Sequence, residues 1–169
     1  MKFVYLFSSI IFLSSLFSCS NVKEHKSKSN YDFKSISKVI FQFHDASVPP
    51  DFHRSLTYTI TPSQLNFMVD SYGEIVKDTT IKIDEGKWHH ITQALQQCEI
   101  SKANSVKQME SGCTGGTGNS MEVFFNDESS WNAHIYYCAN EYEGDLLGDL
   151  PCFIESIKKD IDPKVFAHD

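Results

Sequence analysis

Cysteine, histidine and glycine are the residue types in this 169-residue chain whose placement suggests chemistry. Four cysteines lie in the body of the chain, Cys98, Cys113, Cys138 and Cys152, and a fifth, Cys19, lies near its start. Cys113 with a histidine from elsewhere would make a thiolate nucleophile, a common hydrolase device. In an exported protein, four such cysteines are explained more simply by two disulfides.

Two histidines flank the Pro49-Pro50 dipeptide, and they are the best candidates for a metal or acid–base site. His44 is followed by Asp45, and His53 is followed by Arg54. Zinc sites use three or four ligands, and nothing in this spacing brings a third ligand close. We therefore expect solvated surface histidines, with no metal, no other cofactor and no catalytic residue, while a hydrolase that uses these residues stays the alternative.

A glycine-rich loop contains Gly112, Thr114, Gly115 and Gly116. Backbone N–H groups of such loops can bind an anion, but a phosphate-binding P-loop needs Lys-Ser/Thr after its last glycine. Here Asn119-Ser120 follows, so we expect glycines that permit positive φ beside a disulfide. The acidic stretch 139–148 lacks the spacing of a calcium-binding EF-hand, and we interpret it as a solvated loop.

The N-terminus has the anatomy of an export signal. Lys2 precedes an apolar run over residues 3–16, which is shorter than the roughly 20 residues of a membrane-spanning helix and is interrupted by serines. Its ending, Leu16-Phe17-Ser18-Cys19, resembles the lipobox of bacterial lipoproteins. This resemblance implies that residues 1–18 are removed, that Cys19 is acylated, and that the lipid holds the protein on a membrane of the cell envelope.

Residues 19–36 are expected to be the lipidated cysteine and a flexible polar tether, and residues 37–169 one domain. That domain has ten lysine and arginine residues against twenty aspartate and glutamate residues. Affinity for polyphosphate depends on lysine and arginine, so nucleic acid is excluded as a partner.

Hydrophobic periodicity predicts the elements of this domain. Residues 39–44, 56–61, 65–70, 75–83, 121–125 and 131–137 alternate as strands do, and apolar residues recur at three- and four-residue spacing after the helix caps Asp84 and Asp149. The order β-β-β-β-α-β-β-α predicts an α+β fold in which two helices cover one apolar face of an antiparallel sheet. Trp88 and Phe153 are expected in the core, and residues 99–119 in a long polar loop.

Three short stretches extend the resemblance to small lipoprotein domains of Bacteroidetes-type bacteria, over about residues 37–162. They are Val48-Pro49-Pro50-Asp51-Phe52-His53-Arg54, Asp70-Ser71-Tyr72-Gly73 and Gly112-Cys113-Thr114-Gly115-Gly116-Thr117. The resemblance supports the compartment and a single domain, and it implies no activity.

The four cysteines of the domain allow three pairings. We expect Cys98–Cys113 and Cys138–Cys152, because each bridge would clamp a nearby loop. Cys98 would instead reach Cys152 if the two predicted helices run antiparallel, or would stay a buried thiol.

The leading functional hypothesis is a non-catalytic, lipid-anchored binding or accessory module of the envelope. Its ligand, a protein or a small molecule, would contact one face of the sheet or the loops at 44–54 and 111–118. These loops contain the candidate binding residues His44, Asp45, His53, Arg54, Gly112, Thr114, Gly115 and Gly116. A third hypothesis is an inhibitor that inserts residues 48–54 into an envelope enzyme.

Overall fold

The computed structural model describes residues 33–109, 113–159 and 161–166. Eight strands form one antiparallel sheet in the order β4-β3-β2-β1-β6-β7-β8-β5. The strands are β1 (Ile36–His44), β2 (Ser55–Ile60), β3 (Gln64–Ser71), β4 (Glu74–Lys82), β5 (Ser101–Lys107), β6 (Thr117–Phe125), β7 (Ser130–Cys138) and β8 (Glu141–Leu147). The predicted α+β fold is confirmed.

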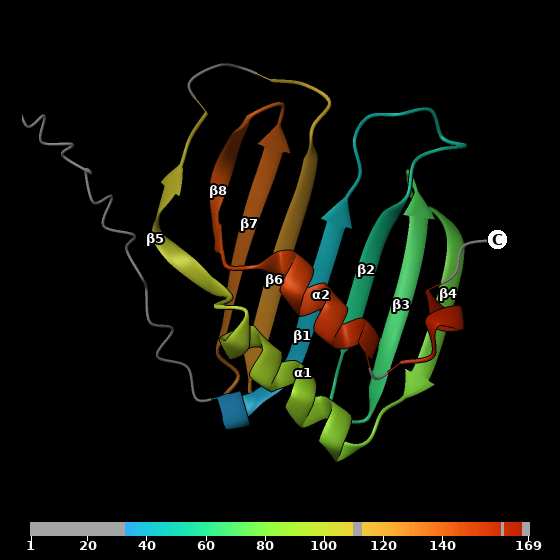
Figure 1. Cartoon of the computed structure of the whole chain (residues 1–169), viewed down its shortest axis with the longest axis vertical. Coiled ribbons are helices and arrows are strands. Elements are labelled where there is room, and N and C mark those ends of the chain that lie inside the picture. Colours follow the sequence, from blue (N-terminus) through green and yellow to red (C-terminus); the bar gives the residue numbers. More distant parts are fainter. Residues whose placement is uncertain (1–32, 110–112, 160, 167–169) are drawn as a thin grey trace, which may run out of the picture.

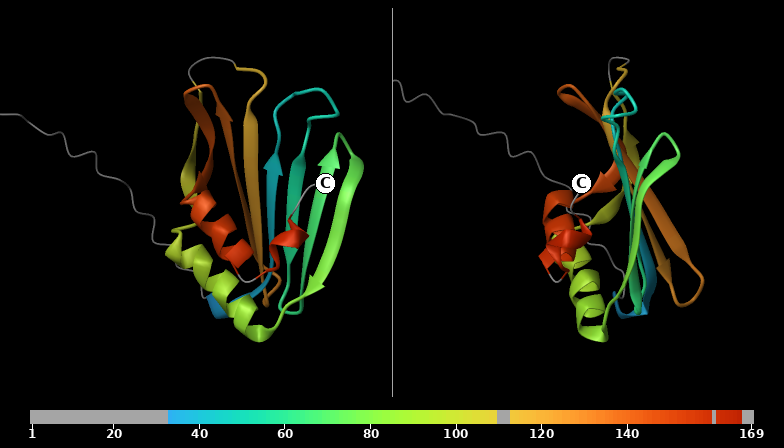
Figure 2. Two further views of the ribbon diagram at one scale, coloured as in Figure 1. Left: turned by 45° about the vertical axis from the view of Figure 1, so that its right-hand side comes forward. Right: turned by 90° about the vertical axis from the view of Figure 1, so that its right-hand side faces the viewer.

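Two helices, α1 (Glu85–Gln97) and α2 (Leu150–Lys159), lie on the same face of this sheet (Figure 1). The predicted caps begin both helices: Lys87 N donates to the Asp84 carboxylate, and Cys152 N donates to the Asp149 carboxylate, each at 2.9 Å. Seen along the sheet, the helices occupy one side only (Figure 2). The opposite face of the sheet is therefore not covered by either helix.

The core lies between the helices and the sheet, as predicted. Trp88 and Phe153 are both buried in it. The fully buried side chains also include Val39, Tyr58, Ile60, Leu65, Phe67, Ile91, Leu95, Met121 and Ile157. Burial, with a smaller contribution from the negative charge of Glu155, raises the pKa of Tyr58 to about 12.

The domain begins slightly earlier than the sequence indicates. Phe33–Ser35 form a short 3₁₀ turn, Phe33 packs against the core, and β1 starts at Ile36. Residues 33–36, which the sequence assigns to the tether, therefore belong to the domain, because Phe33 packs its aromatic side chain against the core. Residues 1–32, with Cys19 and the expected signal, lie outside the described residues.

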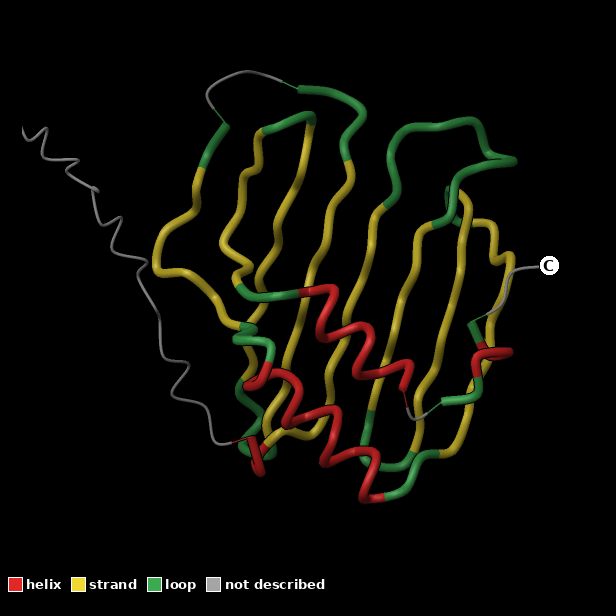
Figure 3. Tube along the Cα trace, in the orientation of Figure 1, coloured by secondary structure: helices red, strands yellow, loops and turns green. Residues whose placement is uncertain are grey.

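Two segments expected as loops are strands. β5 takes up part of the predicted polar loop and forms an edge of the sheet, and β8 takes up the acidic stretch and pairs with β7 and β5 (Figure 3). In β8, Leu146 belongs to the core, while the buried carboxylate of Asp145 accepts a hydrogen bond from His134 N at 2.9 Å. With one core residue, the strand shows no apolar alternation that would identify it in the sequence.

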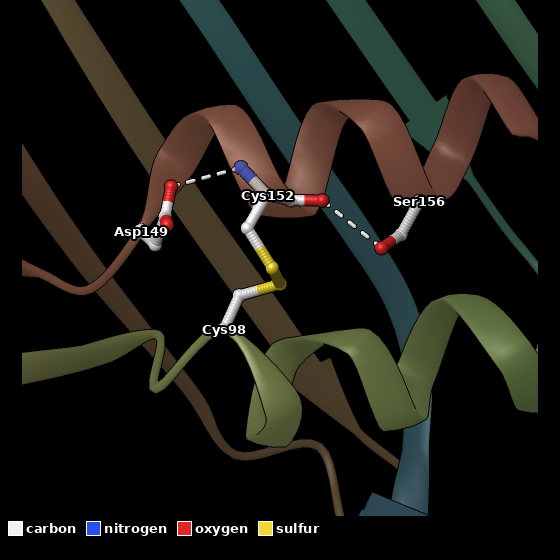
Figure 4. The surroundings of a disulfide bond; sticks show 4 residues. All are labelled: Cys98, Asp149, Cys152 and Ser156. Atoms are coloured by element: carbon white, nitrogen blue, oxygen red, sulfur yellow. Dashed lines mark hydrogen bonds between the residues drawn. A yellow bond between two sulfur atoms is a disulfide. The ribbon is translucent and has the colours of Figure 1, made fainter.

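The predicted disulfide pairing is wrong. Cys98 is bonded to Cys152 and Cys113 to Cys138, with Cα–Cα distances of 5.8 and 6.1 Å. The two helices run antiparallel, so the end of α1 lies beside the first turn of α2 and Cys98 reaches Cys152 (Figure 4). The second disulfide ties the loop before β6 to the end of β7.

Candidate functional site

The uncovered face of the sheet is polar at its centre. The register places three rows of side chains side by side across β1, β6 and β7. The rows are His44–Gly118–Tyr136, Gln42–Ser120–His134 and Ile40–Glu122–Asn132. Residues directly opposite one another on antiparallel strands share a face, so these rows form one surface.

Two hollows indent this surface. The first, of about 300 Å³, lies over Gln42, Ser120, Glu122, Asn132 and His134. The second, of about 380 Å³, adjoins it toward the loops and is also lined by Ser120 and His134. Because they share these two residues, we treat them as one feature, the open-face groove, which runs along the strands.

Hydrogen bonds fix the side chains at the middle of the groove. Ser120 Oγ donates to Gln42 Oε1 at 3.1 Å, and His44 Nε2 lies 3.3 Å from the same Oγ. His134 Nδ1 lies 3.5 Å from Asp145 Oδ1, and Lys102 Nζ lies 3.5 Å from the other oxygen of that carboxylate. Each imidazole is therefore positioned through one of its nitrogens.

Gly118 lines the second hollow, at the loop end of the groove. A Cβ built there would meet only ordinary contacts, 3.6 Å to the Ile135 carbonyl oxygen and 3.8 Å to His44 Cβ. The backbone at this position does not require glycine, and a larger side chain there would meet His44 and extend toward the second hollow. At Gly116, by contrast, a Cβ would collide with the Tyr137 carbonyl oxygen.

The structure divides the candidate binding residues into two groups. His44, Asp45, Gly115 and Gly116 line the second hollow. Thr114 is exposed but outside the hollow's lining, and Gly112 lies outside the described residues. Only the first residues of the loop at 44–54 and the last residues of the loop at 113–118 therefore line the groove.

His53 and Arg54 belong to a different part of the loop. His53 is 6% exposed and stacks on Tyr72, so the expectation of a solvated histidine is wrong at this position. Arg54 donates through Nη1 to the carbonyl oxygens of His53 and Pro50. Asp45 accepts backbone N–H bonds from Ala46 and Arg54, each at 2.8 Å. These contacts hold the loop together, and His44 and His53 do not line a common hollow.

The polar strand residues of the groove other than His44 were not predicted as site residues: Gln42, Ser120, Glu122, Asn132, His134 and Tyr136. The sequence does indicate that these residues face away from the core, because each occupies a polar position of a strand with alternating apolar residues. That signal does not reveal which strands adjoin, and β1 pairs with β6 across about 80 residues of sequence.

Comparisons with protein-family models, with curated proteins and with solved structures find no match to this chain. Among residues 33–109, 113–159 and 161–166, no three histidine, cysteine, aspartate or glutamate side chains cluster as metal ligands would. Neither helix of this described part is long and apolar enough to cross a membrane.

Proposed function

We propose that this chain is a lipid-anchored envelope protein whose domain binds a ligand in the open-face groove without catalysing its conversion. The observation that carries the proposal is the groove itself, a depression with several polar side chains in its lining at the centre of an uncovered sheet face. Side chains with unused hydrogen-bonding capacity, held in place by their neighbours, are what a pre-formed binding site requires.

The direction of β1 supports this proposal. Its first residue, Ile36, adjoins the N-terminal segment, and its last, His44, lines the groove. The nine residues of β1 span about 30 Å at roughly 3.3 Å per residue. β1 therefore separates the end of the domain where the proposed tether joins it from the loop end of the groove (Figure 1).

The neighbours of Ser120 suit the binding of a polar ligand. Its Oγ lies 3.1 Å from Gln42 Oε1 and 3.3 Å from His44 Nε2, so a hydroxyl, an amide and an imidazole form one hydrogen-bonded group at the middle of the groove. Two disulfides in a domain of this size suit an oxidising compartment, as an exported lipoprotein of the Bacteroidetes-type family would experience.

The anchor is tested by replacing the proposed lipidated residue. We expect full-length protein to partition with membranes and its mature N-terminal peptide to carry acyl chains, whereas Cys19→Ser leaves the protein unacylated. Two or more chains give stable anchoring where one chain is marginal. An unmodified N-terminus on membrane-extracted wild-type protein would refute the anchor.

The groove is tested by filling it. In Gly118→Leu the added side chain rises into the second hollow, and Thr80→Leu adds the same side chain on β4, outside the groove. Envelope fractions from the producing cells are passed over each full-length protein, and the bound material is measured. We expect wild type and Thr80→Leu to bind it and Gly118→Leu not to bind it. Equal retention by all three proteins would show that the groove is not the binding site.

A second candidate function is insertion of residues 48–54 into an envelope enzyme. Phe52 is 73% exposed at the tip of this loop, while Tyr72 Oη and Ser71 Oγ hold the loop by donating to the carbonyl oxygens of Val48 and Pro50. An exposed aromatic side chain on a fixed loop is a typical interface anchor. This function predicts that the wild-type protein inhibits an enzyme activity of envelope extracts. Loss of that inhibition in Phe52→Ala, with full inhibition by Gly118→Leu, would favour it.

A further inference from the structure

The chemical composition of the open-face groove restricts its ligand. Among the described residues, no lysine or arginine lines either hollow. The lining contains the carboxylates of Glu122 and Asp45, and Lys102, which lies 3.5 Å from Asp145, is not part of it. A phosphate, sulfate or carboxylate ligand would meet carboxylates without the cations that normally recognise it.

The groups that line the groove both donate and accept hydrogen bonds. Gln42 and Asn132 present amides, Ser120 and Tyr136 present hydroxyls, and His134 presents an imidazole. Each of these groups is a donor and an acceptor. An apolar ligand would leave them unpaired at a cost of about 1 to 3 kcal/mol per group, whereas a ligand rich in hydroxyl groups would satisfy both roles.

The shape of the groove fits a chain of rings. From the Ile40–Glu122–Asn132 row to the His44–Gly118–Tyr136 row the strands advance four residues, about 13 Å. At the loop end, His44 and Tyr136 are the neighbours of Gly118 on the two adjoining strands, and the Tyr136 hydroxyl accepts a hydrogen bond from Gly116 N at 2.9 Å. The C–H face of a sugar ring is apolar and packs well against aromatic side chains.

An extended peptide fits this site less well. Peptides that bind sheets as an added strand need a free edge, but β1, β6 and β7 are each paired on both sides. A peptide lying across the strands would have its backbone groups met only by side chains.

We propose that the open-face groove binds a neutral oligosaccharide. This inference rests on the proposed binding function of the groove. Glu122 accepts from the sugar hydroxyl groups, the two amides both donate and accept, and the His44 and Tyr136 rings at the loop end pack against the apolar face of one sugar ring.

The test is calorimetric titration of the full-length protein in a detergent without a sugar headgroup. The probes are neutral malto-, cello-, manno- and chito-oligosaccharides of two to six units, hexagalacturonate as an anionic chain, and a hexapeptide of alanine and serine. We expect at least one neutral series to bind, with affinity rising from the disaccharide to the hexasaccharide, and no binding of the anionic chain.

Variants assign that binding to the groove. Gly118→Leu is expected to weaken it more than about 10-fold, and Asn132→Ala about 5- to 10-fold, as the loss of one hydrogen bond predicts. Thr80→Leu should bind as wild type does. Thermal unfolding in the absence of sugar establishes that each variant is folded.

The outcomes separate the ligand class from the binding function. Tighter binding of hexagalacturonate or of the hexapeptide, or no binding of any neutral series, overturns the saccharide proposal. If Gly118→Leu still loses retention of envelope material in that case, the groove remains a binding site for another ligand. If the neutral sugars bind Gly118→Leu as tightly as wild type, both the groove and the ligand assignment are wrong.

Discussion

The imidazole ring of His53 lies nearly flat on the phenol ring of Tyr72, with ring centroids 4.0 Å apart and planes inclined by 25°. The same tyrosine donates its hydroxyl proton to the Val48 carbonyl oxygen at 2.6 Å. The turn between β3 and β4 therefore holds both ends of the loop that contains Pro49 and Pro50. This contact explains why His53 is buried although the loop around it is polar.

Two substitutions at Tyr72 separate the stacking from the hydrogen bond. Tyr72→Phe keeps the ring and should lower the free energy of unfolding by about 1 kcal/mol, the typical value for one hydrogen bond. Tyr72→Ala should cost more and should increase amide hydrogen exchange over residues 46–54. Equal exchange in these two variants would mean that the ring contact does not hold the loop.

Tyr58 predicts a loss of stability at high pH. Its pKa is about 12 in the folded protein against 10 for an exposed tyrosine, so the folded chain keeps the phenolic proton after the unfolded chain has lost it. The stabilisation is complete below pH 10 and is lost as the pH rises toward 12, by about 2 to 3 kcal/mol.

The matched variant for this effect is Tyr58→Phe, which cannot titrate. Urea unfolding at several pH values between 8 and 11.5 should show a steeper decline for wild type than for the variant. Parallel declines would show that Tyr58 ionises at an ordinary pH.

Phe153 anchors α2 to the sheet. It is fully buried and its ring meets that of Phe41 edge-on, with centroids 6.4 Å apart. Phe153→Ala should therefore lower the free energy of unfolding by about 3 to 5 kcal/mol. Glu155→Ala, on the exposed side of the same helix, is the control, and we expect a change below about 0.5 kcal/mol. Similar midpoints for the two variants in chemical denaturation would mean that α2 is not docked.

The disulfides give a prediction for non-reduced peptide mapping, which should recover Cys98 linked to Cys152 and Cys113 linked to Cys138. The chain-entropy relation assigns about 4 kcal/mol to the first bridge, with a separation of 54 residues, and about 3 to 4 kcal/mol to the second, with 25. Recovery of Cys98 linked to Cys113 would contradict the structure.

The second bridge should also affect the groove. Cys113 lies two residues before Gly115, which lines the second hollow. Replacing Cys113 and Cys138 together with alanine should weaken ligand binding, whereas the same replacement of Cys98 and Cys152 should lower only stability.

Strong local patterns made much of the fold predictable. Asp84 and Asp149 cap the two helices as expected, and the Tyr72-Gly73 turn joins β3 to β4 with positive φ at both residues, as a two-residue hairpin requires. The alternating residues of β1 identify its buried face. These signals all arise from neighbours within a few residues.

The remaining features depend on contacts between distant residues. β5 has one large apolar residue, Val106, and it is 50% exposed, so the strand shows no alternation. In β8, Gly144 lies so close to the His134 carbonyl oxygen that a Cβ would collide with it, and such a glycine resembles a loop signal in the sequence. The groove requires β1 to lie beside β6, which no local pattern indicates.

β1 also determines how the domain would carry mechanical load. If Cys19 carries the proposed lipid, a pull between that lipid and a ligand held by the β6 and β7 side chains of the groove would enter the sheet at Ile36 of β1. The load would pass from β1 to β6 through hydrogen bonds that lie perpendicular to the strands, so it would shear that ladder as a whole instead of opening it one bond at a time. The β1–β6 pairing would then be the force-bearing element between the proposed anchor and whatever the groove holds.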